Sequence, residues 1–366
     1  IRPSIPEDNP LKAAIFLNLG NIYKAKGLIE KAEVNYLLAL ELNEKTLGKS
    51  HPNTALTLFD LARMHMETGR YPEALSGLKR SLEIQEEKLG ANDIYTSTTL
   101  QELGMLHQKL GNYDQSEDYL VRSLKIVQQF FPDKIDRIAT GKNNLAYIYL
   151  LQGRYKESEN LYLESLKETK DLFGEKHITT STSLHNLAVL YQVQGRYKKS
   201  EQLYKQALEN VNEELGTSTN DLKIAAIYAG LANLYEDQDL YRQAEQYYLM
   251  ALDTQQKYLD SSHPDLQLTR INLAGLYYKQ AKYNESGQIY LDSLVHLEKL
   301  LGPNHLDVAS VLNSLGIISQ RINNDAGAEY FLRRALKIRE EKLGSSHPDI
   351  ARTLIALGFL YDGNNS

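Results

Sequence analysis

The sequence repeats itself with a period of about 42 residues, and this period limits the folds open to the chain. A small residue inside an apolar stripe recurs at Gly20, Ala62, Gly104, Ala146, Ala188, Ala232, Ala274, Gly316 and Gly358, with steps of 42 residues except for one step of 44. Each repeat is one supersecondary unit that cannot bury its apolar face alone. The period therefore predicts an array of stacked units that grows lengthwise without a central core.

Each repeat is predicted to form two amphipathic helices. In the segment 184–208, Leu184, Leu187, Ala188 and Tyr191 share one helical face, and a second stripe begins at Ser200. A glycine separates the stripes in five repeats, at Gly27, Gly69, Gly111, Gly153 and Gly195, and is replaced by Asp239, Ala281 and Asn323 in the last three. This residue is expected to end the first helix in a left-handed conformation.

The connectors between repeats also recur. Histidine opens the next repeat at His51, His177, His263, His305 and His347, often followed by proline, which suits a first helical turn. Since these histidines lie about 42 residues apart with no cysteine or histidine at ligand spacing, a capping role is favoured over a metal site. His65 and His107 replace a packing tyrosine and are expected in the core.

The recurring positions give eight helix pairs and a ninth first helix over Asp349–Tyr361. We expect an N-terminal lead-in over residues 1–10, one solenoid domain over 11–361 and a tail over 362–366. A longer loop is expected within Thr217–Lys223, where the connector carries two extra residues. The lack of an initial Met and the unpaired ninth helix indicate a piece of a longer protein.

Composition excludes several classes of function. A net charge of −6 argues against a nucleic-acid or anionic-membrane partner. No run of 18 apolar residues predicts a membrane span, and no segment of the sequence is predicted to be a signal peptide. With no cysteine there is no disulfide framework, and a cytoplasmic location fits best. Phosphate-binding loops, nucleophile elbows and zinc motifs are absent, so the segment is predicted not to be an enzyme and to need no cofactor or metal.

The pattern Leu-x-x-Leu-Ala-x-x-Tyr followed by Ser-x-x-x-Tyr resembles the tetratricopeptide repeat. The 42-residue form, with its Glu-Glu-Lys-Leu-Gly-x-x-His-Pro segment at Glu340–Pro348, looks like the kinesin light chain type of repeat. The resemblance covers residues 11–361. It implies an all-α, right-handed superhelical solenoid of stacked antiparallel helix pairs, whose first helices line a concave groove.

The resemblance also places a binding surface on the first helices, at residues that point away from the packing stripe. Counted from the small residue, these lie two or three positions before it, one after it, and four or five after it. Family members use an Asn two positions before it to pair with a peptide backbone, because an amide both donates and accepts. The candidate groove residues are Asn18, Asn21, Arg63, Asn143, Asn144, Tyr147, His185, Asn186, Gln192, Asn233, Asn272 and Asn313.

The predicted groove is mixed in character, with apolar pockets and few charges. Arg63, Lys109, Lys279 and Arg321 are scattered along it, and they would suit an acidic peptide. For each single residue the alternative interpretation is a solvated side chain or a bond to a neighbouring helix.

Two functions from different classes stay open. The first is a protein–protein interaction scaffold that holds an extended peptide or a partner protein in the groove. The second is a sensor or autoinhibitory arm of a larger signalling enzyme, such as a switch NTPase or a caspase-like protease, whose effector domain lies outside this segment. The partner in both is a protein or peptide, with no nucleic acid or membrane, and the oligomeric state is open.

Overall fold

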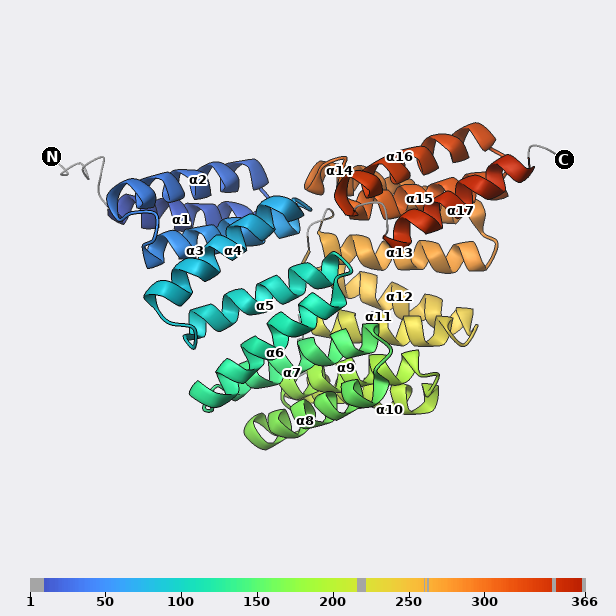
Figure 1. The fold of residues 1–366 in the computed structure, drawn as a ribbon. Helices are drawn as coiled ribbons and strands as arrows, with labels where there is room; N and C mark the ends of the chain where they lie inside the picture. Colours follow the sequence, from blue (N-terminus) through green and yellow to red (C-terminus); the bar gives the residue numbers. More distant parts are fainter. Residues whose placement is uncertain (1–9, 216–221, 260, 262, 344–346, 364–366) are drawn as a thin grey trace. The chain divides into compact units, whose positions relative to one another are not determined.

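A computed structural model describes residues 10–215, 222–259, 261, 263–343 and 347–363. Within these ranges it contains seventeen α-helices and no β-strand (Figure 1). The helices are α1 (Pro10–Ala25), α2 (Ile29–Thr46), α3 (Pro52–Glu67), α4 (Tyr71–Lys88), α5 (Ile94–Lys109), α6 (Tyr113–Phe130), α7 (Ile135–Leu151), α8 (Tyr155–Phe173), α9 (Ile178–Val193), α10 (Tyr197–Leu215), α11 (Leu222–Glu236), α12 (Tyr241–Gln256), α13 (Pro264–Lys279), α14 (Tyr283–Leu301), α15 (Leu306–Arg321), α16 (Asp325–Leu343) and α17 (Pro348–Gly363).

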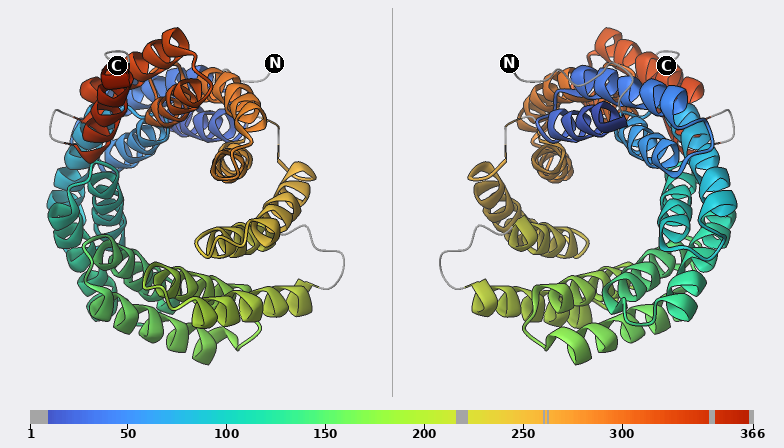
Figure 2. Two further views of the ribbon diagram at one scale, coloured as in Figure 1. Left: turned by 90° about the vertical axis from the view of Figure 1, so that its right-hand side faces the viewer. Right: turned by 90° about the vertical axis from the view of Figure 1, so that its left-hand side faces the viewer.

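The chain divides into two compact units, residues 1–154 with α1–α7 and residues 155–366 with α8–α17. In each unit an odd-numbered first helix packs antiparallel against the even-numbered second helix next in the chain, as α1 does with α2 and α9 with α10 (Figure 1). Each second helix also packs on the next first helix, as α2 does on α3 (Figure 2). The all-α solenoid of stacked helix pairs is confirmed.

The ends of the chain fall close to where the repeat pattern puts them. α1 begins at Pro10, inside the expected lead-in, and residues 1–9 lie outside the described residues. Most of the expected loop at Thr217–Lys223 is also outside them, although Leu222 and Lys223 already belong to α11. The ninth first helix is confirmed as α17, which extends into the expected tail as far as Gly363. The single domain over 11–361 stays a prediction.

The turn after each first helix has the predicted left-handed residue. At the end of α9, Gly195 has a φ of +70°, its N–H donates to the Gln192 carbonyl (2.9 Å), and the Arg196 N–H donates to the Tyr191 carbonyl (2.8 Å). These two bonds make a Schellman motif, which satisfies carbonyls that the helix leaves unpaired. The replacements Asp239, Ala281 and Asn323 keep the conformation, with φ between +57° and +58°.

The small residues of the repeat lie where two helices approach closely. A Cβ atom built on Gly20, Gly104 or Gly316 would come within 2.5–2.6 Å of the facing second-helix residue, which is Tyr36, Leu120 or Leu332. The alanines at the same position, such as Ala188 and Ala232, are fully buried. The packing stripe predicted from the period is therefore correct.

The connector histidines cap first helices. In all five histidines, the ring Nδ1 accepts a hydrogen bond from the backbone N–H of the residue two positions later, with N···N distances of 3.1–3.2 Å. These histidines are His51, His177, His263, His305 and His347. A nitrogen that accepts this bond satisfies a helix N–H that would otherwise lack a partner. The capping prediction is confirmed, and His65 and His107 are buried in the core as expected.

A polar joint that the sequence did not reveal links successive repeats. Tyr191 on α9 donates its hydroxyl to Glu159 on the preceding second helix, α8 (2.7 Å). Arg196 lies over the Tyr191 ring, 4.0 Å from its centroid, and donates to the same carboxylate at 3.1 Å. The same arrangement joins Tyr277, Glu245 and Lys282 in a later repeat; there burial, helped by the nearby Glu245 carboxylate, raises the pKa of Tyr277 to about 12. The stripe tyrosine therefore tethers repeats through its hydroxyl as well as filling space.

Candidate binding surface on the first helices

The candidate site in each unit is its first-helix surface, made by the residues that face away from the second helices: those of α1, α3, α5 and α7 in the first unit, and those of the odd-numbered helices α9 to α17 in the second. Neighbouring first helices contact each other directly at α1–α3, α3–α5, α5–α7, α9–α11 and α15–α17. Side chains at equivalent positions of neighbouring repeats therefore come close together. The twelve predicted residues divide into those engaged inside the fold and those whose polar groups stay open.

Buried tyrosines of the second helices engage three of the predicted amides. Tyr36 donates to Asn21 Oδ1 (2.6 Å), and Tyr248 donates to Asn233 Oδ1 (2.5 Å). Tyr204 donates to Gln192 Oε1 (3.2 Å). A buried hydroxyl without a partner is costly, so these amide oxygens serve the fold first.

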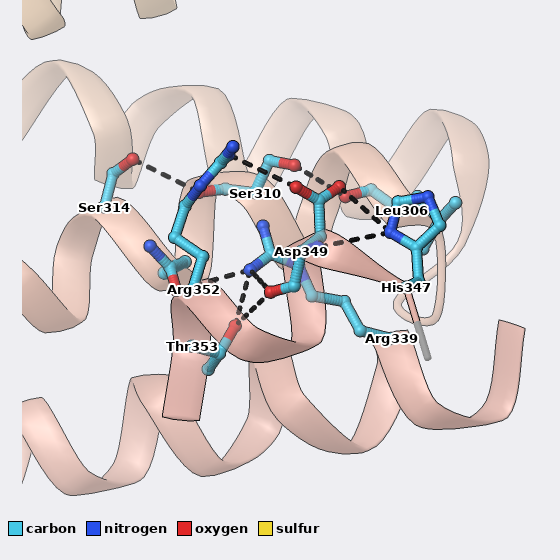
Figure 3. Close-up of polar contacts among 9 residues, drawn as sticks. Leu306, Ser310, Ser314, Arg339, His347, Asp349, Arg352 and Thr353 are labelled. Atoms are coloured by element: carbon cyan, nitrogen blue, oxygen red, sulfur yellow. Dashed lines mark hydrogen bonds and ion pairs between the residues drawn. The ribbon is translucent and has the colours of Figure 1, made fainter. Parts of the chain in front are cut away.

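Asn313 does not belong to the open surface. It is buried on α15, and its Oδ1 accepts a hydrogen bond from Arg339 Nη1 (3.3 Å). Arg339, which is itself only 2% exposed, also donates to the Asp349 carbonyl (2.9 Å) and to Thr353 Oγ1 (2.5 Å), tying α16 to α17 (Figure 3). The predicted ligand-facing role of Asn313 is replaced by a structural one, because a buried guanidinium needs every acceptor in reach.

Four predicted amides keep both polar groups open: Asn18, Asn144, Asn186 and Asn272. None of them bonds to another residue in the part of the chain that the structure describes. All four occupy the position two residues before the small residue, on α1, α7, α9 and α13. In these four repeats the fold therefore does not use the position that the family resemblance assigns to backbone recognition.

Two further predicted residues hold buried polar atoms without a partner among the described residues. Asn143 Oδ1 and His185 Nδ1 are buried and make no hydrogen bond within the described residues. The His185 ring meets Tyr204 edge-on at 5.3 Å, and burial lowers the pKa of His185 to about 4. His185 is therefore neutral at pH 7. Each orphaned atom lies next in sequence to an open amide, Asn144 or Asn186.

The first unit carries more charge on this surface than the sequence indicated. Arg63 on α3 pairs with Glu102 on α5 (3.4 Å), and Lys24 on α1 pairs with Glu67 on α3 (2.7 Å). Asp60 lies beside this network, and burial raises its pKa and that of Glu102 above the usual range. The charges connect neighbouring helices, and their signs were visible in the sequence although their pairing was not.

Similar cross-helix contacts occupy the second unit. Gln192 donates to Asp237 (2.6 Å), and Lys279 pairs with Glu236 (3.0 Å). Arg321 donates to the Tyr278 hydroxyl (3.1 Å). Three of the four cations that would have suited an acidic peptide, Arg63, Lys279 and Arg321, are thus engaged. Tyr147 remains available, with 38% of its surface exposed.

Among the described residues no group of three or more His, Asp or Glu side chains could hold a metal ion. No helix within those residues is long and apolar enough to cross a membrane. The surface presents a series of amides and an exposed tyrosine on stacked helices.

This fold and surface define a helical repeat protein of the solenoid class. A family model, the tetratricopeptide repeat, matches residues 11–76, 61–129, 137–213, 223–286 and 265–341. The chain belongs to the tetratricopeptide repeat family. No curated protein matches the sequence.

Solved structures of similar fold include a kinesin light chain protein, a quorum sensor and a Rap protein. A Podosopora anserina kinesin light chain protein with nearly identical TPR-like repeats is 20% identical, with a TM-score of 0.51 over 57% of this chain and 99% of that one. The apo quorum sensor NprR from B. thuringiensis is 16% identical, with a TM-score of 0.58 over 90% of this chain and 88% of that one. A Rap protein complexed with competence and sporulation factor is 15% identical, with a TM-score of 0.56 over 96% and 97%. At these identities the likeness shows the fold alone.

Proposed function

We propose that the first-helix surface binds an extended segment of a partner protein and that the chain acts as a non-catalytic interaction module of the cytoplasm. The observation that supports this is the set of open amides at Asn18, Asn144, Asn186 and Asn272. All four occupy the same position of the repeat, two residues before the small one. By contrast, Asn21 and Asn233, one residue after the small one, accept hydrogen bonds from tyrosines.

The proposed mechanism is backbone recognition. A side-chain amide donates from its NH₂ and accepts at its oxygen, so it pairs with a peptide N–H and C=O whatever the ligand's side chains are. Amides held on packed helices are already positioned, which reduces the entropy lost on binding.

A sensor arm of a larger signalling protein is the second candidate. It is supported by the likeness of fold to the quorum sensor NprR and to the Rap protein in complex with competence and sporulation factor, over most of this chain. In this case the same surface binds the signal, and the response is made elsewhere. The two candidates share the binding step and differ in the response that binding triggers.

The test changes two open amides, Asn144→Ala and Asn186→Ala together, and compares partner capture with the wild type. The matched control is Asn160→Ala with Asn284→Ala, two exposed amides on the second helices α8 and α14. Partners captured from native lysate are measured by quantitative mass spectrometry, and tiled peptides of each are titrated by fluorescence polarisation.

The variant removes one open amide from each unit, and an amide that pairs with a peptide backbone can make two hydrogen bonds, so a peptide bound to either unit is expected to weaken about 5- to 100-fold. The melting temperature should stay close to that of the wild type, because neither amide bonds within the described fold. Unchanged affinity in the first variant, or equal loss in the control, would contradict the assignment.

A further inference from the structure

A second feature lies on α17, which has no second helix after it in the described part of the chain. The pair α11–α12 shows what a second helix normally covers. Tyr228, four positions before the small residue, packs on the Tyr247 ring of α12 with centroids 6.0 Å apart, and Tyr235, three positions after the small residue, stacks on the same ring at 5.4 Å. These two positions therefore belong to the face that a first helix turns toward its own second helix.

On α17 the same two positions are exposed. Leu354 is 49% exposed, whereas the leucines at its position in four other repeats are at most 6% exposed; these are Leu58, Leu100, Leu184 and Leu312. Tyr361 is 41% exposed, whereas the equivalent Tyr191 and Tyr235 are at most 9% exposed. α17 thus leaves open an apolar face that other first helices bury.

The small residue of the ninth repeat, Gly358, has no helix against it. The glycines at its position on α1, α5 and α15 lie so close to a second helix that an added Cβ would clash, whereas a Cβ atom built on Gly358 meets nothing within 4 Å. Ile355 and Phe359 beside it are exposed and extend the apolar surface. We call Leu354, Ile355, Gly358, Phe359 and Tyr361 the α17 face. It has the close-approach position of a helix pair without the second helix.

The opposite side of α17 is anchored to the preceding repeat. Ala356 and Leu357 are buried in one apolar cluster with Leu332 of α16. The Tyr361 hydroxyl donates to Glu329 (2.9 Å) and accepts a hydrogen bond from Arg333 (2.8 Å), both on α16. Because the helix is already held in place, an occupant of the α17 face meets an ordered surface and less entropy is lost on binding.

The charges at the two ends of the α17 face have opposite signs. Arg352 is exposed near the start of the helix, where it pairs with Asp349 (3.2 Å, Figure 3), and Asp362 is exposed near its end. Ten residues of helix separate Arg352 from Asp362 by about 15 Å along the axis, and helical geometry puts both on the Phe359 side of Gly358.

This charge pattern is complementary to itself in one orientation only. When a second α17 runs antiparallel about a two-fold axis near Leu357, Arg352 of each copy lies opposite Asp362 of the other. A parallel arrangement would instead oppose like charges. The antiparallel orientation is also the one in which each first helix packs on its own second helix elsewhere in the chain.

We propose that the α17 face binds the α17 face of a second copy of this chain, as an antiparallel helix pair that takes the place of the first helix–second helix pair of the other repeats. Leu354 of one copy then packs near Gly358 and Tyr361 of the other, and the two Arg352–Asp362 contacts set the register. The contact uses none of the open amides, so it goes beyond the proposed function. Since one helix face buries little area, the dimer is expected to be weak.

The first test measures self-association of the 366-residue chain by sedimentation equilibrium. The wild type is expected to dimerise with a dissociation constant on the order of 10–100 μM, as suits a small interface. Leu354→Glu, which puts a charge into the apolar centre of both copies, should weaken the dimer at least about 30-fold. The matched control is Leu249→Glu on α12, since Leu249 is 48% exposed, and this variant should dimerise as the wild type does. Circular dichroism checks that both variants fold.

The second test identifies the occupant and its orientation by exchanging charges. Arg352→Glu and Asp362→Lys should each weaken the dimer about tenfold, because each opposes like charges at both ends of the pair. An equal mixture of the two variants should associate about as tightly as the wild type, because every contact between unlike copies again joins opposite charges. A parallel pair or a different occupant would give no such recovery.

Three outcomes would overturn the proposal. They are a wild type that stays monomeric up to about 1 mM, equal association in Leu354→Glu and Leu249→Glu, and a mixture of the charge variants that associates no more tightly than either alone. The Asn144→Ala, Asn186→Ala protein should dimerise as the wild type does. Failure of the dimer is therefore distinguishable from failure of the proposed peptide binding.

Discussion

The turn between α13 and α14 holds an alanine in a conformation that alanine disfavours. Ala281 has a φ of +58°, where five other repeats place glycine and two place Asp or Asn. A left-handed backbone costs a residue with a Cβ about 1–2 kcal/mol, and glycine escapes this cost. Against this, glycine lowers the free energy of unfolding by roughly 0.4–1 kcal/mol relative to alanine, because the unfolded chain has more conformational freedom at a glycine. Since Ala281 is exposed and little packing is lost, Ala281→Gly is expected to stabilise its repeat by about 0.5–1 kcal/mol.

The effect should be local, because repeat arrays are stabilised pair by pair. Native-state hydrogen exchange is therefore the preferred assay, measured at Lys282, whose amide donates to the Tyr277 carbonyl at 2.9 Å across the turn. Urea unfolding, monitored by circular dichroism, gives the global midpoint.

The control is the same chemical change in a helix. Ala14 is exposed on α1, and Ala14→Gly should destabilise its repeat by about 0.5–1 kcal/mol, because glycine there only weakens the helix. Opposite signs for the two substitutions support the strain argument. A lower protection at Lys282 in Ala281→Gly, or the same sign in both proteins, would refute it.

Two other predictions concern joints and charges. A double-mutant cycle of Tyr191→Phe and Glu159→Gln should give a coupling free energy of about 1 kcal/mol by urea unfolding, because the hydroxyl donates to a partly buried carboxylate; strictly additive effects would show that the joint contributes nothing. Asp60→Asn should raise the stability of the first unit at pH 7, because burial disfavours the Asp60 carboxylate and raises its pKa. That advantage should shrink as the pH falls through the raised pKa, since the wild type then binds a proton more readily folded than unfolded. Unfolding midpoints of both proteins from pH 7 to pH 4 check this, and a pH-independent difference would contradict it.

The helices could be predicted from the sequence because their signals are local. Gly195 ends α9 through bonds to residues within five positions of it, and His177 caps the start of α9 through a residue two positions away. Small residues such as Gly20, Gly104 and Gly316 mark close helix contacts at the same offset in their repeats. Repetition strengthens each signal, since a position is seen up to nine times in one chain.

The polar contacts were harder to predict because they depend on pairs of residues in different helices. In the sequence Asn313 cannot be distinguished from the other candidate groove amides. Its structural role depends on the buried Arg339, which lies 26 positions later and donates to it. The sequence likewise suggests that Arg63 is an unpaired cation, whereas in the structure it pairs with Glu102 of the next repeat. Neither partner recurs in the other repeats, so the period carries no information about them.

A different polar contact, between a tyrosine of the second helix and an asparagine of the first, can be predicted from the repeat positions. Where the second helix has Tyr four positions after its small residue and the first helix has Asn one position after its own, the two side chains bond, as in Tyr36 with Asn21 and Tyr248 with Asn233. This rule removes an Asn one position after the small residue from the candidate ligand-binding residues. It does not concern an Asn two positions before the small residue. Amides at the latter position, such as Asn144 and Asn186, make no hydrogen bond to another described residue. The proposed binding surface is accordingly narrower than the predicted groove, and its specificity rests on the repeats in which that earlier position is still Asn.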